Sequence, residues 1–198
     1  MSKKFELTSN FKVFLGRKLF QIKALVSFGD VKEGDLGGYI EKEENLSHDG
    51  NAWVCGDAKV YGNAKVFDNA KVYDNAEVFG NAKVCDNAKV YGNAKVSGNA
   101  KVYDNAEVFD NAKVSGDAKV FGNAKVSDNA DYATIKGFGT EYRTTTFFRC
   151  KDGVTRVKCG CFYGDLNEFR NQVKNTRSGK IAEEYLMIAD LMEKHFSK

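Results

Sequence analysis

Residues 50–133 repeat a six-residue pattern of apolar and polar positions. Fourteen consecutive hexads follow the form Gly/Asp–Asn/Asp–Ala–x–Val–x without insertion, and only the last replaces its Val, with Tyr132. Within each hexad Ala and Val alternate with outward residues, which predicts a short strand with Ala and Val inside. Gly, Asp and Asn favour a corner between strands. A fixed short period of this kind predicts a parallel β-helix.

The segment before the hexads predicts a cap. Two apolar runs, at residues 11–15 and 19–26, indicate short strands, and a glycine-rich stretch follows at residues 29–38. The first coil of a solenoid exposes an apolar end and a strand edge, so we expect residues 1–49 to cover it. A phosphate-binding loop is disfavoured because no helix start follows Gly37 and Gly38.

The segment after the hexads predicts a small α+β unit over residues 137–198. Residues 141–150 are β-rich, Asp152 and Gly153 suit a two-residue hairpin turn, and residues 155–162 form the return strand. Asp165 begins a helix that reaches about Thr176, and an apolar stripe from Ile181 to Phe196 indicates a second helix. The expected unit is ββαα, and the hexads with their linker occupy residues 50–136.

Two stretches of the chain resemble a known group of proteins. Residues 29–40 read GDVKEGDLGGYI, and residues 45–54 read NLSHDGNAWV and lead into the hexads. They are similar to a family of hexapeptide-repeat proteins, frequent in bacteriophages and bacteria, that are often labelled transferase-like or polymer-forming. Residues 160–164 share the similarity more loosely. The resemblance implies a left-handed parallel β-helix with three hexads per coil, commonly trimeric in the wider superfamily.

With three hexads per coil, residues 18 apart stack on one another. The fold class is then mainly β, a β-helix of about 4.7 coils and roughly 22 Å. Outward aromatic residues would form columns, which indicate either an oligomer interface or stacking that stabilises the sheets. The candidate interface residues are Phe67, Tyr73, Tyr91, Tyr103, Phe109 and Phe121. One face also carries a lysine column, at residues 65, 83, 101 and 119, either neutralised by Asp68, Asp86 and Asp104 or open to an anion.

The C-terminal hairpin provides a candidate ligand site. A two-residue turn pairs Arg149 with Arg156 and places their side chains on one face with Arg143, Phe147 and Lys158. Two arginines opposite each other favour an anion, because the guanidinium fork donates paired hydrogen bonds to phosphate. Phe147 would stack on a base. A three-residue loop would shift the register and dissolve this cluster.

Composition narrows the function classes. A net charge of +3 is too small to indicate nucleic acid, no apolar run is long enough to span a membrane, and no signal peptide is visible. Five cysteines without an export signal favour reduced thiols in a cytoplasm, that of the host if the protein is phage-encoded. Cys150, Cys159, Cys161 and His195 make only a weak zinc motif, so we expect no metal and no cofactor.

Three functions remain open at this point. The preferred hypothesis is a non-catalytic oligomeric binding protein, most simply a trimer, that sequesters an anionic, nucleotide-like ligand or a host protein. The second is a structural scaffold, such as a virion or polymer-forming piece. The third is a diverged acyl-CoA-dependent acyltransferase, disfavoured because no histidine lies between His48 and His195 to act as general base.

Overall fold

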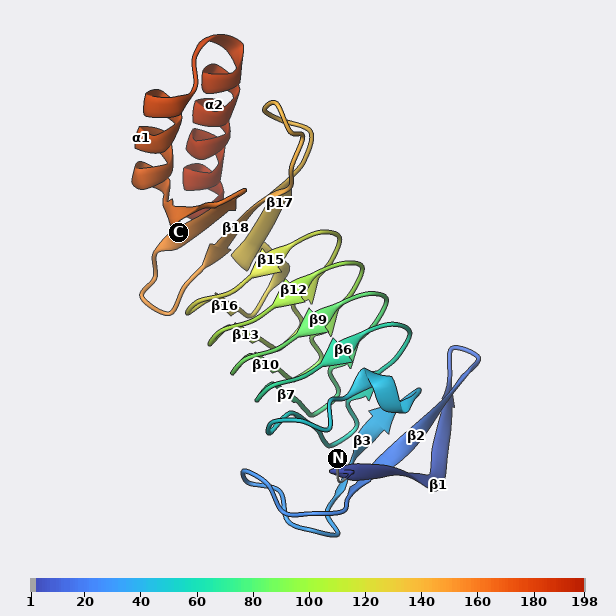
Figure 1. Ribbon diagram of the computed structural model, residues 1–198. Coiled ribbons are helices and arrows are strands. Elements are labelled where there is room, and N and C mark those ends of the chain that lie inside the picture. The colour runs from blue at the N-terminus through green and yellow to red at the C-terminus, as the bar shows by residue number, and fades with distance from the viewer. Residues whose placement is uncertain (1–2, 198) are drawn as a thin grey trace.

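The computed structural model describes residues 3–197 of the chain. A cap, a solenoid and a C-terminal unit follow one another along the chain (Figure 1). The N-terminal elements are β1 (Phe5–Phe14), β2 (Arg17–Ala24), β3 (Leu36–Ile40) and a 3-10 turn, η1 (Glu43–Asn45).

Between residues 53 and 126 the solenoid consists of thirteen two-residue strands. Each strand from β4 to β13 pairs in parallel with the strand 18 residues later, as Val66 does with Val84, so the strands stack into three sheets. The strands are β4 (Trp53–Val54), β5 (Lys59–Val60), β6 (Lys65–Val66), β7 (Lys71–Val72), β8 (Glu77–Val78), β9 (Lys83–Val84), β10 (Lys89–Val90), β11 (Lys95–Val96), β12 (Lys101–Val102), β13 (Glu107–Val108), β14 (Lys113–Val114), β15 (Lys119–Val120) and β16 (Lys125–Val126). The predicted parallel β-solenoid is confirmed.

The solenoid core consists of the alanine and valine columns. From Ala52 to Val126 these side chains are fully buried, as the alternation predicted. Backbone hydrogen bonds join each coil to the next, for example from Lys83 N to Ala100 O at 2.9 Å and from Cys85 N to Val102 O at 3.0 Å. The absence of proline from the sequence leaves every backbone N–H able to take part.

The corners are held by side chains that reach the next coil. Asp86 has a φ of +57°, and its carboxylate accepts a hydrogen bond from Asp104 N at 3.2 Å. Asparagine side chains do the same along a neighbouring position, with Asn81 Nδ2 donating to Asn99 Oδ1 at 3.0 Å. One corner has glycine in every coil, at Gly62, Gly80, Gly98 and Gly116, and a Cβ on Gly98 would lie only 2.9 Å from the backbone nitrogen of Gly116. The glycines therefore serve the stacking of this chain's own coils.

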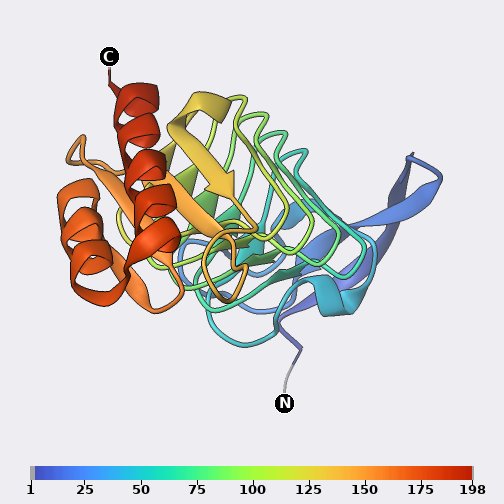
Figure 2. The same ribbon diagram turned by 90° about the horizontal axis from the view of Figure 1, so that it is seen from above.

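The N-terminal cap extends one solenoid sheet. Strand β3 pairs in parallel with β5, and the antiparallel hairpin β1–β2 continues the sheet beyond it. The Nζ of Lys4 donates to the carbonyls of Gly50 and Ala52, closing the first coil, and burial lowers the pKa of Lys4 to about 8. The tip of the hairpin projects away from the solenoid (Figure 2) and leaves Val13 and Leu15 mostly exposed.

The C-terminal unit closes the other end of the solenoid. Its elements are η2 (Asn129–Asp131), β17 (Tyr132–Ile135), β18 (Thr145–Arg149), β19 (Thr155–Cys159), β20 (Phe162–Asp165), α1 (Leu166–Thr176) and α2 (Gly179–Phe196). The four strands form one antiparallel sheet in chain order. Phe148 on one face packs against the last coil, and Phe147 on the other packs against the helices. Within residues 3–197, neither helix is long and apolar enough to cross a membrane.

Two expectations for this unit are wrong. The final hexad leaves the solenoid, because Asp131 accepts from Ser127 N and folds residues 129–131 into a 3-10 turn before β17. Strand β17 and strand β20 then enlarge the predicted hairpin to four strands. The unit is a sheet covered by two helices, not a bare ββαα arrangement.

The predicted hairpin register is also wrong. Arg149 pairs with Thr155, and Phe148 pairs with Arg156, one residue away from the predicted pairing. The loop has three residues, 151–153, because Gly153 takes a φ of +78° and the Cys150 N–H bonds to Val154 O at 3.1 Å. A shift of one residue sends each side chain to the opposite face, so Thr146, Phe148 and Cys150 do not share a face with Val157 and Cys159.

Candidate functional site

The predicted arginine cluster does not form. Phe147 is fully buried between the sheet and the helices and presents no surface to a base. Arg149 is on the helix side, where its Nη2 donates to Phe196 O at 2.7 Å and its Nε lies 3.1 Å from the Asp131 carboxylate. Arg149 therefore ties the solenoid end to the last helix and is not open to a ligand.

The other two cations of the hairpin face the solenoid. Arg156 pairs with the Asp152 carboxylate at 2.8 Å, and its Nη1 is buried without a hydrogen-bond partner among residues 3–197. The Lys158 ammonium lies 5.6 Å from the ring centroid of Phe121. Of the predicted ligand residues, Arg143 lines a cavity.

That cavity belongs to a cleft between the C-terminal sheet and its helices. Two adjoining hollows, of about 260 and 100 Å³, share the same central residues. Phe162, Phe169 and Val173 give the larger hollow apolar walls, and Arg143 borders the smaller. The shared residues are Cys159, Cys161, Arg177 and Tyr185.

Two glycines shape the cleft. Gly139 has a φ of +73°, and a Cβ there would lie 2.4 Å from the Tyr185 hydroxyl, so the loop can approach the helix only with glycine. Tyr185 in turn donates to Phe138 O at 3.2 Å and fixes this loop to α2. A Cβ on Gly160 would lie 3.1 Å from Arg143 Nη1, so the turn between β19 and β20 leaves room for that guanidinium.

The charged side chains along the cleft are two arginines and one glutamate, Glu141, and they are weakly engaged. Arg177 Nη1 donates to its neighbouring backbone carbonyl, Thr176 O, at 3.1 Å. Arg143 Nη2 lies 3.5 Å from Glu141, and both side chains are more than half exposed. Burial first, and then the nearby Cys159 thiol, raise the pKa of Tyr185 to about 12, so its hydroxyl remains a neutral donor at physiological pH. Because the Tyr185 hydroxyl already donates to Phe138 O, the donors that the cleft offers to an anion are the guanidinium groups of Arg143 and Arg177.

Sequence reasoning missed two of these residues. Arg177 follows the end of the first helix and has no periodic neighbours that would single it out, and Tyr185 was assigned only to the apolar stripe of the second helix. Only the three-dimensional closure of loop 136–144 onto α2 brings them beside Arg143. No pattern in the sequence signals this closure.

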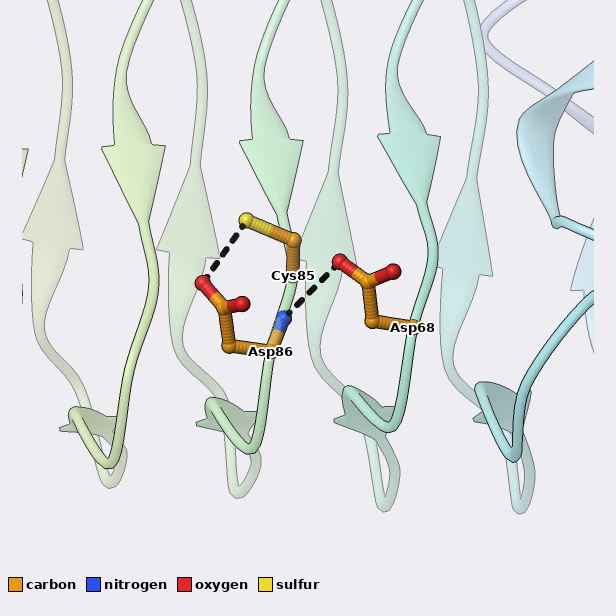
Figure 3. A group of neighbouring side chains, drawn as sticks. All are labelled: Asp68, Cys85 and Asp86. Carbon is orange, nitrogen blue, oxygen red and sulfur yellow. Dashed lines mark hydrogen bonds between the residues drawn. The ribbon is translucent and has the colours of Figure 1, made fainter.

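A second group of polar side chains lies at one solenoid corner. Asp68, Cys85 and Asp86 place one potential metal-ligating atom each within 4.8 Å of one another (Figure 3). The Asp68 carboxylate accepts from Asp86 N at 3.5 Å, and that of Asp86 accepts from the thiol at 3.4 Å. Burial, and then the hydrogen bond to Asp86, raise the pKa of Cys85 to about 12. Because both carboxylates and the thiol already form hydrogen bonds within and between the coils, we assign this group to corner stability.

The outward aromatic columns stack on themselves. Ring centroids are 4.8 Å apart for Tyr73 and Tyr91, 5.0 Å for Tyr91 and Phe109, and 4.8 Å for the pair Tyr103 and Phe121. The rings in each pair are nearly parallel, so the faces that two stacked rings turn toward each other are covered. This geometry supports the interpretation that the columns stabilise the sheets.

His48 lies in the cap with both ring nitrogens engaged. Its Nδ1 accepts from Lys4 N at 3.1 Å, and its Nε2 lies 2.7 Å from the Glu43 carboxylate. The ring also stacks on Phe5 at 4.3 Å. Since Nδ1 is an acceptor, Nε2 carries the proton, and this imidazole is committed to holding the cap.

Comparison with known proteins assigns neither a family nor a function to the chain. No protein-family model matches the chain, and no curated protein matches it either.

Proposed function

We propose that this chain is a non-catalytic binding protein that holds a small organic anion in the cleft of its C-terminal unit. The observation that carries the proposal is the position of Arg143 and Arg177 on a cleft with aromatic walls. Neither guanidinium forms a close ion pair with a buried carboxylate among residues 3–197. Arginine forks at the rim of an apolar hollow suit a ligand with an apolar body and a phosphate or carboxylate.

The dimensions of the cleft favour a compact ligand. The larger hollow, about 260 Å³, is near the lower end of small-molecule sites. In the proposed arrangement a ring packs beside Phe162 and Phe169, while the anionic group meets the two arginines. A mononucleotide combines these two parts, so the nucleotide-like ligand predicted from sequence is retained at a different site.

The handedness of the solenoid, its family and its origin belong to the same proposal. A left-handed winding, a relation to hexapeptide-repeat proteins and a phage origin rest on the resemblance at residues 29–54. A phage protein in its host's cytoplasm would act by sequestration, which requires affinity and no turnover. The resemblance also implies a trimer, but the charge pattern of one solenoid face supports a two-fold pair instead, as described below.

Calorimetric titration with mononucleotides, dinucleotides and cyclic nucleotides tests the ligand. We expect micromolar binding of at least one of them, weakened at least about tenfold in Arg143→Gln/Arg177→Gln because charge-assisted hydrogen bonds are lost. The matched control is Lys174→Gln/Lys194→Gln, which removes two exposed charges from the helices outside the cleft. Absence of binding to the wild type, or equal weakening by both double variants, would contradict the proposal.

Of the two alternatives, the structural scaffold has support of its own and the acyltransferase does not. The regular coils and self-stacked aromatic columns favour a structural scaffold, which would bind no nucleotide in the same titration. The acyltransferase alternative requires a histidine that can take a proton from a substrate. Both nitrogens of His48 are already engaged within the cap, which argues against it.

A further inference from the structure

One face of the solenoid carries three parallel stripes of different character. The face is formed by β6, β9, β12 and β15, and we call it the striped face. Its lysine stripe consists of Lys65, Lys83, Lys101 and Lys119. Its apolar stripe consists of Phe67, Cys85, Tyr103 and Phe121, and its acidic stripe, along the next corner, consists of Asp68, Asp86 and Asp104.

The lysine stripe contains no acidic residue, unlike the corresponding columns on the other two faces. On those faces a glutamate interrupts the column, and Glu77 pairs with Lys95 at 2.9 Å while Glu107 pairs with Lys151 at 3.1 Å. On the striped face lysine follows lysine, with Lys83 in register between its neighbours on both sides. Like charges at strand spacing are unfavourable.

The acidic stripe does not neutralise these lysines within the chain. Among residues 3–197 no salt bridge joins a member of the lysine stripe to any carboxylate, so the expected neutralisation has no contact to support it. The apolar stripe lies between the two charged rows; Phe67, Cys85 and Tyr103 are half-buried, and Phe121 is buried beside the C-terminal sheet. The Asp86 and Asp104 carboxylates instead accept hydrogen bonds from backbone N–H groups of the next coil.

The apolar stripe continues past the last coil. The ring of Phe121 lies 4.8 Å from that of Tyr103 and 4.5 Å from that of Tyr163 in the C-terminal sheet. Tyr163 remains 43% exposed. The centre of the striped face therefore offers a narrow apolar strip with a positive row on one side and a negative row on the other.

We propose that the striped face binds the striped face of a second copy of this chain. A two-fold axis parallel to the solenoid axis exchanges left and right across the face but preserves height along it. It therefore sets each lysine row opposite the acidic row of the other copy, with the apolar stripes in contact at the centre. A two-fold axis across the stripes would instead set lysine against lysine.

The pairing is specific coil by coil. Lys65, Lys83 and Lys101 meet Asp68, Asp86 and Asp104 of the second copy, and the reciprocal pairs form by symmetry. Lys119 meets Gly122, which has no carboxylate. Four coils at about 4.8 Å give a face only roughly 19 Å tall, so the association is weak and visible at high protein concentration.

Sedimentation equilibrium from low micromolar to near-millimolar concentration tests the pairing. We expect a monomer–dimer equilibrium that weakens as salt is raised. Lys83→Glu relieves repulsion within its own column but confronts Asp86 of the second copy twice, and should raise the dimer dissociation constant at least about tenfold. Asp86→Asn should weaken the dimer in the same direction, because asparagine keeps the left-handed corner and its acceptor oxygen but loses the charge.

Matched controls lie on the other faces. Lys113→Glu makes the same charge change beside Lys95, and Asp74→Asn makes the same corner change elsewhere, so both should leave the dissociation constant unchanged. Circular dichroism verifies that each variant is folded. A monomer at every concentration, a trimer, or equal effects of test and control variants would overturn the proposal.

Discussion

The solenoid and the C-terminal sheet fix strand register in different ways. In the solenoid each strand has only two residues, but the same 18-residue offset recurs from β4 to β16 and the corners repeat with it. In the C-terminal sheet strands of four or five residues depend on the length of one loop each. A repeated offset resists slippage because one coil out of step would disturb its neighbours, whereas a single loop carries no such check.

The largest expected effect comes from a charge placed in the solenoid core, which tests the inward position of the valine column. Val90 is fully buried at mid-solenoid, so Val90→Asp buries a carboxylate without a partner. The expected cost exceeds about 5 kcal/mol, comparable with the whole stability of a domain. Circular dichroism and solubility should report an unfolded or aggregated protein. The exposed replacement Lys113→Asp is the control, and a soluble, cooperatively folded Val90→Asp protein would refute the inward assignment.

A substitution with a smaller expected effect tests the strand register of the C-terminal sheet. Phe147 is fully buried against the helices, so Phe147→Ala should cost about 3–5 kcal/mol of unfolding free energy. Denaturant unfolding measures this loss. Phe11, 44% exposed on the N-terminal hairpin, is the control, and its replacement by Ala should cost less than about 1 kcal/mol. Equal small losses would favour the two-residue turn, in which Phe147 points away from the helices.

The smallest expected effect concerns Asp131, which lies at the junction between the solenoid and the C-terminal sheet. Burial opposes the charge of Asp131, but hydrogen bonds from Ser127 and Asp128 and the charge of Arg149 outweigh it and hold the pKa of Asp131 below its ordinary value. A lowered folded-state pKa adds stability above the unfolded pKa, near 4, which is lost as pH falls through the folded value.

Asp131→Asn should therefore lower the thermal midpoint at neutral pH and flatten its decline in acid. Thermal unfolding followed from neutral to acidic pH measures both changes. Asp110→Asn, at a solenoid corner whose left-handed backbone asparagine tolerates, provides the comparison. An unchanged acid slope in the Asp131 variant would contradict this role for the junction.

The sequence was informative where a pattern was repeated. Alternation of Ala and Val predicted the buried columns, and a Gly or Asp at each corner predicted left-handed turns, such as those at Gly62 and Asp68. Each hexad repeated the same pattern, so the prediction of inward residues and corners did not depend on any single hexad. The exception is the last hexad, where Tyr132 replaces valine and the chain leaves the solenoid.

The candidate site was not predictable in the same way. Lys151, Asp152 and Gly153 suit both a two-residue turn and a three-residue loop that ends in a left-handed glycine, and only the second occurs. That one-residue difference buried Phe147 and separated Arg149 from Arg156. The cleft beside Arg177 depends on the contact of a loop with a distant helix, for which a single sequence carries no periodic signal.

Because the 18-residue offset is constant, the number of solenoid turns determines the distance between the two end units. Each turn of the solenoid adds about 4.8 Å and reuses the same backbone bonds and the same corner chemistry. A gain or loss of one complete turn would leave both end units facing structurally equivalent neighbours. The number of repeats therefore sets the distance between the N-terminal cap and the C-terminal unit.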